Sequence, residues 1–157
     1  MKYFVIAGEA SGDMHAANMI KYLQVMDAGA QVAGWGGDQM QAQGVQLMKH
    51  IQELAFMGFA EVLMNIGTIL KNFTLCKKQI SAFKPDLLVL VDYPGFNLRM
   101  AGWAKKQGYK VVYYISPTVW AWKENRIVKV KKYVDRMICI LPFEKAFYAK
   151  WDYAADY

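Results

Sequence analysis

The sequence is poor in the residues that build metal centres and disulfide frameworks. Its only histidines are His15 and His50, and its only cysteines are Cys76 and Cys139. Each cysteine stands alone in an apolar stretch, so we expect two reduced thiols in the core rather than a disulfide. A zinc site made of protein side chains needs about four ligands at close spacing, and the scarcity of both residue types argues against one.

Long apolar runs are also missing. No stretch approaches the roughly 18 consecutive apolar residues of a membrane-spanning helix. The N-terminal MKYFVIAGEA becomes polar too early for a signal peptide. With 55% hydrophobic and 20% charged residues, the chain can build one core without cross-links. We therefore expect a cytoplasmic protein with a single domain over residues 1–157.

Negative charge is in the minority. The 19 Lys and Arg residues outnumber the 13 Asp and Glu residues, which gives a formal net charge of +6. This balance favours anionic partners, namely phosphate groups, acidic lipids or nucleic acid. A basic segment over residues 123–132 follows Trp120 and Trp122, but it matches no nucleic-acid-binding module and fits a solvated helix face. We expect no nucleic-acid partner.

Strand and helix patterns alternate along the chain. The expected strands are 2–7, 31–35, 45–48 with a continuation at 51–54, 87–91, 110–115 and 136–141. The expected helices are 14–25, a short one from Asp38 to about 43, 59–83 with a break at Gly67, 98–107, the basic segment, and a terminal helix with Pro142 in its first turn. Alternation of this kind predicts an α/β fold, a Rossmann-like parallel sheet with helices on both faces.

The segment LLVLVDYPGFN, residues 87–97, carries the first candidate site residue. Its aliphatic run predicts a strand that is buried on both faces and ends at Asp92. Ligands of open α/β sheets collect beyond the carboxyl ends of the strands, so Asp92 is placed to meet a substrate. Asp92 also fits a plain turn cap, and both interpretations stay open. Asn97 is a suitable N-cap for the following helix.

Polar loops follow two further strands. The first runs from Gly8 to Asp13, and its backbone N–H groups can face an anion at a helix N-terminus. Its spacing matches neither a dinucleotide fingerprint nor a P-loop, and Ser11 or Asp13 equally fits a simple N-cap. The second loop begins at Ser116. Right-handed crossovers bring the carboxyl ends of parallel strands to one edge, so we expect the three loops to share a cleft.

An apolar cluster lies in and just before the predicted long helix. It consists of Phe56, Met57, Phe59 and Met64. Scattered exposed apolar residues are common in proteins, whereas a cluster rimmed by lysines can touch a membrane interface. The pattern alone leaves both interpretations open.

Six segments together resemble a known family. They are AGEASGD at 7–13, GWGGDQM at 34–40, AFMGFAEVL at 55–63, VDYPGFN at 91–97, YYISPTVWAWKENR at 113–126 and LPFEKAFY at 141–148. In this order, and over nearly the whole chain, they resemble the N-terminal half of lipid-A-disaccharide synthases. The resemblance implies a GT-B glycosyltransferase, in which two Rossmann-like halves face each other across a cleft.

The resemblance also implies a reaction and a location. The family transfers 2,3-diacylglucosamine from UDP-2,3-diacylglucosamine to 2,3-diacylglucosamine 1-phosphate and releases UDP. The product is a β-1,6-linked disaccharide, the anomeric centre is inverted, and no metal or other cofactor takes part. Because the acylated substrates reside in the inner membrane, we expect a cytoplasmic protein peripherally associated with that membrane. Its apolar cluster would then dock to lipid or admit acyl chains.

Site residues carry over from the family by position. Asp92 matches a functionally important aspartate and is the expected base for the acceptor hydroxyl. Glu9 is the second catalytic candidate, for orienting sugar hydroxyls. The residues expected to contact substrate are Gly8, Ser11, Gly12, Asp13, Asn97, Ser116 and Trp120.

The chain departs from the family in two respects. Gly95 stands where many members have an acid, which leaves Asp92 as the only acid of its loop. The family continues into a C-terminal half that supplies most of the UDP site, whereas this sequence ends at Tyr157. The isolated half is therefore expected to turn over little or nothing. A non-catalytic α/β module that binds a phosphate-bearing or lipid ligand is the alternative.

Overall fold

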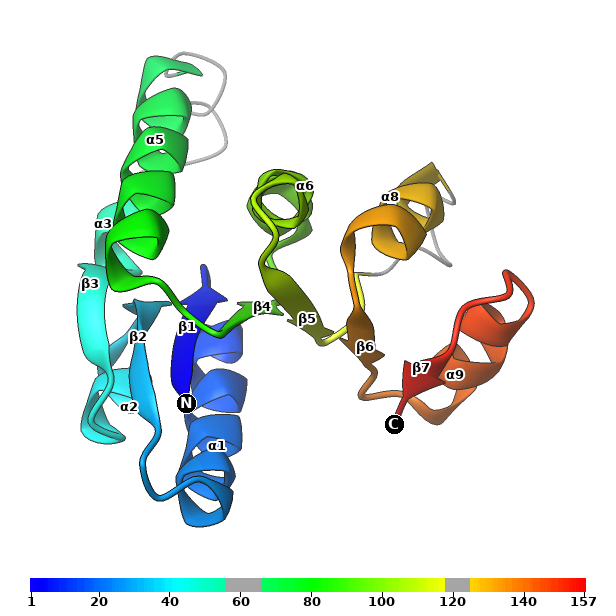
Figure 1. The fold of residues 1–157 in the computed structure, drawn as a ribbon, viewed down its shortest axis with the longest axis horizontal. Coiled ribbons are helices and arrows are strands. Elements are labelled where there is room, and N and C mark those ends of the chain that lie inside the picture. The colour runs from blue at the N-terminus through cyan, green and yellow to red at the C-terminus, as the bar shows by residue number, and fades with distance from the viewer. Residues whose placement is uncertain (56–65, 118–124) are drawn as a thin grey trace. The chain divides into compact units, whose positions relative to one another are not determined.

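The computed structural model describes residues 1–55, 66–117 and 125–157 (Figure 1). They form two compact units, Met1–Asp86 and Leu87–Tyr157. In both units strands alternate with helices, and the strands within each unit pair in parallel. The predicted α/β class with parallel strands is confirmed.

The described part of the first unit has three strands in the order β3-β2-β1. Its elements are β1 (Lys2–Ala7), α1 (Ala10–Met26), β2 (Gln31–Gly36), α2 (Asp38–Ala42), β3 (Gln46–His50), α3 (Gln52–Ala55) and α5 (Ile66–Phe83). β1 has the predicted bounds, because its run of apolar residues is continuous.

Helices cover both faces of this sheet. Tyr3 and Phe4 point to opposite faces, because side chains alternate along a strand. The Tyr3 hydroxyl donates to Asp27, just after α1, at 3.1 Å. The Phe4 ring instead meets Phe83, at the end of α5, with ring centroids 6.1 Å apart. α1 and α5 therefore cover opposite faces, and β1 is buried from Tyr3 to Ala7.

β1, the first strand of this unit, is hydrogen-bonded to Asp86, the last residue of the unit. The Lys2 N–H donates to Asp86 Oδ2 at 2.7 Å, and the Asp86 N–H donates to the Lys2 carbonyl at 2.8 Å. Lys2 Nζ also donates to the Phe83 carbonyl at 2.6 Å. The segment that leaves α5 is thereby tied to the start of β1.

Gly34 marks a very close approach of β1 and β2. A Cβ atom at this position would lie 1.9 Å from the Val5 carbonyl oxygen, which belongs to the backbone and cannot turn aside. We expect Gly34→Ala to lower the free energy of unfolding by about 1–3 kcal/mol, the usual cost of overpacking a core.

Urea unfolding measures this loss, and Gly67→Ala is the matched control. Gly67 lies in α5, and a Cβ atom added there would meet no other atom within 4 Å, so alanine should raise stability by about 0.5–1 kcal/mol. A Gly34→Ala protein as stable as the Gly67→Ala protein would contradict the packing argument.

The described part of the second unit has four strands in the order β4-β5-β6-β7. Its elements are β4 (Leu87–Val91), α6 (Pro94–Lys106), β5 (Lys110–Tyr114), α8 (Asn125–Tyr133), β6 (Arg136–Ile138), α9 (Pro142–Ala149) and β7 (Ala155–Asp156).

α6 packs beside α8 (Figure 1). At this contact Gly102 faces the Tyr133 ring, which a Cβ atom would approach to 3.4 Å. The predicted bounds of β4 are confirmed.

Several predicted boundaries are wrong. Residues 52–55 form α3 instead of continuing β3, because the Glu53 carboxylate accepts the His50 N–H at 3.1 Å and starts a helical turn. β6 ends at Ile138 because the Leu141 N–H donates to Glu144 at 3.1 Å at the start of α9. Gly67 lies inside α5 and does not interrupt it.

Both cysteines are free and buried, as predicted. Burial raises the pKa of the Cys76 thiol far above its usual range. Burial, followed by the charges of Glu144 and Asp156, raises the pKa of Cys139 to about 12. Both groups therefore stay protonated at neutral pH and behave as apolar core residues.

Candidate functional site

The end of β4 is a sharp turn made of two left-handed residues. Asp92 has a φ of 46° and Tyr93 a φ of 49°, and α6 begins at the next residue, Pro94. Each non-glycine residue in this region costs about 1–3 kcal/mol, and such residues cluster at functional sites. Asp92 is half-buried directly after the buried Val91. The strand thus carries a carboxylate out of the core at its carboxyl end, as the sequence predicts.

Asn97 belongs to this turn and is not the N-cap of the helix. α6 starts three residues earlier than Asn97, with Tyr93 in the N-cap position, so the capping prediction is wrong. The Asn97 side chain is fully buried. Its Nδ2 donates to the Val91 carbonyl at 3.2 Å and to the Asp92 carbonyl at 2.8 Å. The amide therefore holds the main chain around Asp92.

The end of β5 is a second tight turn. Ile115 has a φ of 66°, which is rare for a β-branched residue. Ser116 is buried, and its hydroxyl donates to the Pro117 carbonyl at 3.0 Å. The Tyr148 hydroxyl of α9 lies 2.7 Å from Ser116 Oγ, and the two hydroxyls form a buried hydrogen bond. Ser116 thus joins β5 to α9, and its predicted contact with substrate stays a prediction.

The glycine loop is shorter than the sequence predicts. α1 begins at Ala10 instead of Met14, so Ser11 lies in its first turn. Glu9 occupies the N-cap position, is exposed, and makes no side-chain capping bond. Ser11 is also exposed, whereas Gly12 is buried and Gly8 is half-buried. The N-terminus of α1 therefore presents a glutamate and a serine to solvent.

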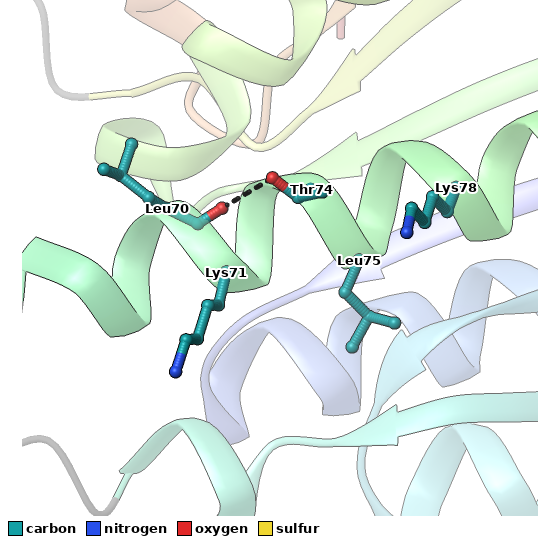
Figure 2. Close-up of a pocket in the computed structure, with 5 residues that line it drawn as sticks. All are labelled: Leu70, Lys71, Thr74, Leu75 and Lys78. Atoms are coloured by element: carbon teal, nitrogen blue, oxygen red, sulfur yellow. Dashed lines mark hydrogen bonds between the residues drawn. The ribbon is translucent and has the colours of Figure 1, made fainter.

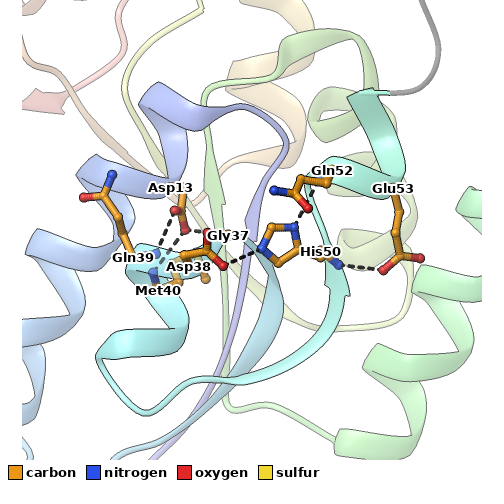
Figure 3. A network of polar contacts seen from close by, with 8 residues as sticks. All are labelled: Asp13, Gly37, Asp38, Gln39, Met40, His50, Gln52 and Glu53. Carbon is orange, nitrogen blue, oxygen red and sulfur yellow. Dashed lines mark hydrogen bonds and ion pairs between the residues drawn. The ribbon is translucent and has the colours of Figure 1, made fainter.

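Asp13 is a buried structural carboxylate (Figure 3). Its side chain is 3% exposed and accepts backbone N–H groups from Gly37 at 2.7 Å, Gln39 at 3.1 Å and Met40 at 3.1 Å. Asp13 therefore caps α2, although its own helix is α1, and the interpretation of Asp13 as the N-cap of its own helix is wrong. Its predicted contact with substrate stays a prediction.

The glycine pair Gly36-Gly37 is the sequence signal for this cap. A Cβ atom on Gly37 would lie 2.7 Å from Asp13 Oδ2, and one on Gly36 would lie 2.3 Å from Met40 Sδ. Only glycine leaves room for the carboxylate and for the methionine side chain. The adjacent polar network of Figure 3 reaches the surface, where His50 Nε2 lies 3.0 Å from Asp38 and His50 Nδ1 accepts the Gln52 N–H at 3.2 Å.

The structure brings the predicted site residues together in two groups. Asp92 and Asn97 meet in the second unit, and Gly8, Glu9, Ser11 and Gly12 are adjacent in the first. A cleft shared by the strand-end loops stays a prediction. Trp120 and the apolar cluster of Phe56, Met57, Phe59 and Met64 lie outside the described residues.

The outer face of α5 combines apolar and basic side chains (Figure 2). Leu70, Lys71, Thr74, Leu75 and Lys78 line a shallow depression of about 350 Å³. Ile66 is 66% exposed and Leu70 is 59% exposed, whereas Phe73, Cys76 and Ile80 are buried. Within α5, the apolar side chains that pack in the core therefore lie from Phe73 onward. No helix in residues 1–55, 66–117 and 125–157 is long and apolar enough to cross a membrane.

The sequence comparisons with known proteins agree on one family. The profile of the family described as lipid-A-disaccharide synthetase matches residues 3–157. A lipid-A-disaccharide synthase of Geobacter metallireducens is 44% identical over 149 residues, which cover 95% of this chain and 39% of the relative. A lipid-A-disaccharide synthase of Myxococcus xanthus is 43% identical over 156 residues, covering 99% of this chain and 41% of that protein. The chain thus spans about two fifths of the length of these relatives.

Solved structures support the fold. A UDP-GlcNAc 2-epimerase of Neisseria meningitidis, solved with bound UDP-GlcNAc, aligns with 99% of this chain, and the aligned part is 45% of the epimerase chain. The TM-score of this alignment is 0.65 and the sequence identity is 14%. A Streptomyces glycosyltransferase aligns with 92% of this chain, and the aligned part is 51% of the glycosyltransferase chain. The TM-score is 0.57 and the sequence identity is 14%. At such low identity the likeness concerns the Rossmann-like α/β fold alone.

Proposed function

The chain belongs to the lipid-A-disaccharide synthetase family, and from this premise we propose that it forms the acceptor-side half of a glycosyltransferase. The proposed donor is UDP-2,3-diacylglucosamine and the proposed acceptor is 2,3-diacylglucosamine 1-phosphate. In this proposal residues 1–157 act as one Rossmann-like domain, and a C-terminal half supplies most of the UDP site.

The observation that supports this role is the turn at Asp92. The carboxylate stands at the carboxyl end of a buried strand, on two left-handed residues. In the proposed step the acceptor hydroxyl oxygen bonds to the anomeric carbon of the donor while the bond between that carbon and UDP breaks. UDP leaves with the electron pair, and Asp92 takes the hydroxyl proton as general base.

Glu9 supports the same proposal from the first unit. It is exposed at the N-terminus of α1, where the partial positive charge of the helix favours an anion. We assign it the orientation of sugar hydroxyls, with Gly8, Ser11 and Gly12 shaping the loop around it. Asp13 stabilises the first unit, and Asn97 and Ser116 stabilise the second, through the buried bonds described above.

The test joins this chain to a C-terminal half of the kind that the proposal requires. This chain is fused to the C-terminal remainder of the Geobacter metallireducens relative, and UDP release is followed with both proposed substrates. We expect activity from the fused protein, and little or none from this chain or the remainder alone. A fused protein that binds the acceptor but never releases UDP would favour the non-catalytic binding module instead.

We propose further that α5 contacts the cytoplasmic surface of the inner membrane. The helix has no acidic residue in its 18 positions, and its exposed Ile66, Leu70 and Leu75 lie among Lys71 and Lys78. Apolar side chains rimmed by lysines suit an interface with anionic headgroups. The protein is then cytoplasmic and peripherally associated with that membrane.

We expect Leu70→Asp to lower binding to anionic phospholipid vesicles at least about tenfold. Burying a leucine contributes about 1.5–3 kcal/mol, and the new carboxylate is also repelled by the lipid. Co-sedimentation of this chain with vesicles measures the effect. The control is Val25→Asp, because Val25 is 80% exposed on α1. Vesicle binding that changes neither with Leu70→Asp nor with the anionic lipid content would refute the membrane contact.

A further inference from the structure

The Asp92 carbonyl oxygen is held by two side chains from different elements. Asn97 Nδ2, from the first turn of α6, donates to it at 2.8 Å. The Tyr113 hydroxyl, from β5, donates to it at 2.6 Å. A backbone bond completes the arrangement, because the Asp92 N–H donates to the Tyr114 carbonyl at 3.0 Å. Both sides of the Asp92 backbone are therefore fixed.

Tyr113 is built into the core at this place. Its side chain is 0% exposed, and residue 113 pairs with Leu90 in the parallel register of β4 and β5. Burial, followed by the negative charge of Asp92, raises the pKa of the hydroxyl well above its usual value. The group stays protonated, so it remains a hydrogen-bond donor at all physiological pH values.

The bonds explain how a strained turn persists. A left-handed conformation at two successive non-glycine residues is maintained only when the surrounding structure over-determines it. The Tyr113 hydroxyl and the Asn97 amide supply two constraints on the carbonyl between these residues. Without the hydroxyl, Asn97 alone holds this carbonyl, and the left-handed backbone at Asp92 and Tyr93 can relax and shift the Cα atom that carries the carboxylate.

We propose that Tyr113 is a positioning residue that aims the Asp92 carboxylate through the Asp92 carbonyl. The inference rests on the proposed glycosyltransferase function, in which Asp92 is the base. Tyr113 itself need not touch substrate, since its hydroxyl is engaged with the main chain inside the core. A base displaced by about 1 Å loses much of its effect on the reaction.

The test compares two hydroxyl deletions in the fused protein. Tyr113→Phe should lower kcat about tenfold and leave KM within about twofold, because substrate binding is retained while the base is misaligned. Tyr153→Phe is the matched control: its hydroxyl also donates to a backbone carbonyl, that of Val134, at 3.0 Å, on the side of the unit formed by α9 and β7. A general stability effect should appear in both variants, and a fall in kcat only in the first. Equal kcat values for the two variants would overturn the inference.

A second readout separates this inference from the function. The Cα and Cβ chemical shifts of Asp92 and Tyr93 report positive φ angles in this chain without any substrate. We expect the positive-φ shifts to persist in Tyr153→Phe and to disappear in Tyr113→Phe. If the unmodified fused protein releases no UDP, the proposed function fails, and the shifts alone still decide whether Tyr113 holds the turn. Unchanged shifts in Tyr113→Phe would refute its positioning role.

Discussion

Replacing Asp92 by Asn should lower kcat of the fused protein by about 10²- to 10⁴-fold, the range that general base catalysis supplies. Asparagine keeps the size and shape of the side chain but cannot accept the acceptor's proton. Asparagine also tolerates the left-handed region better than most residues, so the φ of 46° at this position is retained. The loss therefore measures the carboxylate and not the fold.

The matched control for this experiment is Asp156→Asn. Asp156 lies on β7, is paired with Arg136 at 2.6 Å, and has a side chain that is 51% exposed. An exposed pair of this kind contributes at most about 1 kcal/mol, so stability and kcat should change little. Normal turnover in the Asp92→Asn protein would remove the base assignment.

Replacing Asp13 by Ala should lower the free energy of unfolding by about 3–5 kcal/mol. The substitution removes a buried carboxylate and leaves three backbone N–H groups without their acceptor: those of Gly37, Gln39 and Met40. An unsatisfied buried donor costs about 1–3 kcal/mol. Because a domain is stable by only about 5–15 kcal/mol, a loss of this size is a large fraction of the total.

Urea unfolding of this chain tests the prediction, with two comparison variants. Asp13→Asn keeps one acceptor oxygen and should lose about 2–3 kcal/mol. Asp38→Asn removes a neighbouring carboxylate in the first turn of α2 whose side chain is 83% exposed, and should change stability by about 0.5 kcal/mol or less. Asp13→Ala and Asp38→Asn proteins of similar stability would show that the buried cap is not needed.

Strands were predictable wherever burial is continuous. β1 and β4 have the bounds that their apolar runs predict, Lys2–Ala7 and Leu87–Val91, because both faces of each strand are covered. Helix starts were not predictable in the same way. The sequence predicts that α1 and α6 start at Ser, Asp or Asn residues, but the N-cap positions are Glu9 and Tyr93, and neither side chain makes a capping bond.

The candidate site was predictable only in part. The position of Asp92 follows from a local pattern, a buried strand that ends in an acid. The turn that holds it depends on Tyr113, which is 21 residues away. The partner of Asp13 is similarly distant, at 24 residues for Gly37. Pairings across such separations are set by the register of neighbouring strands, which local spacing does not specify.

The bonds between Lys2 and Asp86 have a consequence for synthesis of the protein. β1 is synthesised before residue 86, and its hydrogen bonds to that residue require the whole intervening segment. At about 5–20 residues per second, the first strand waits on the order of 4–17 s for this partner. During that interval the face of β1 that α5 covers is open, so the nascent chain is most prone to misassociation before residue 86 has been made.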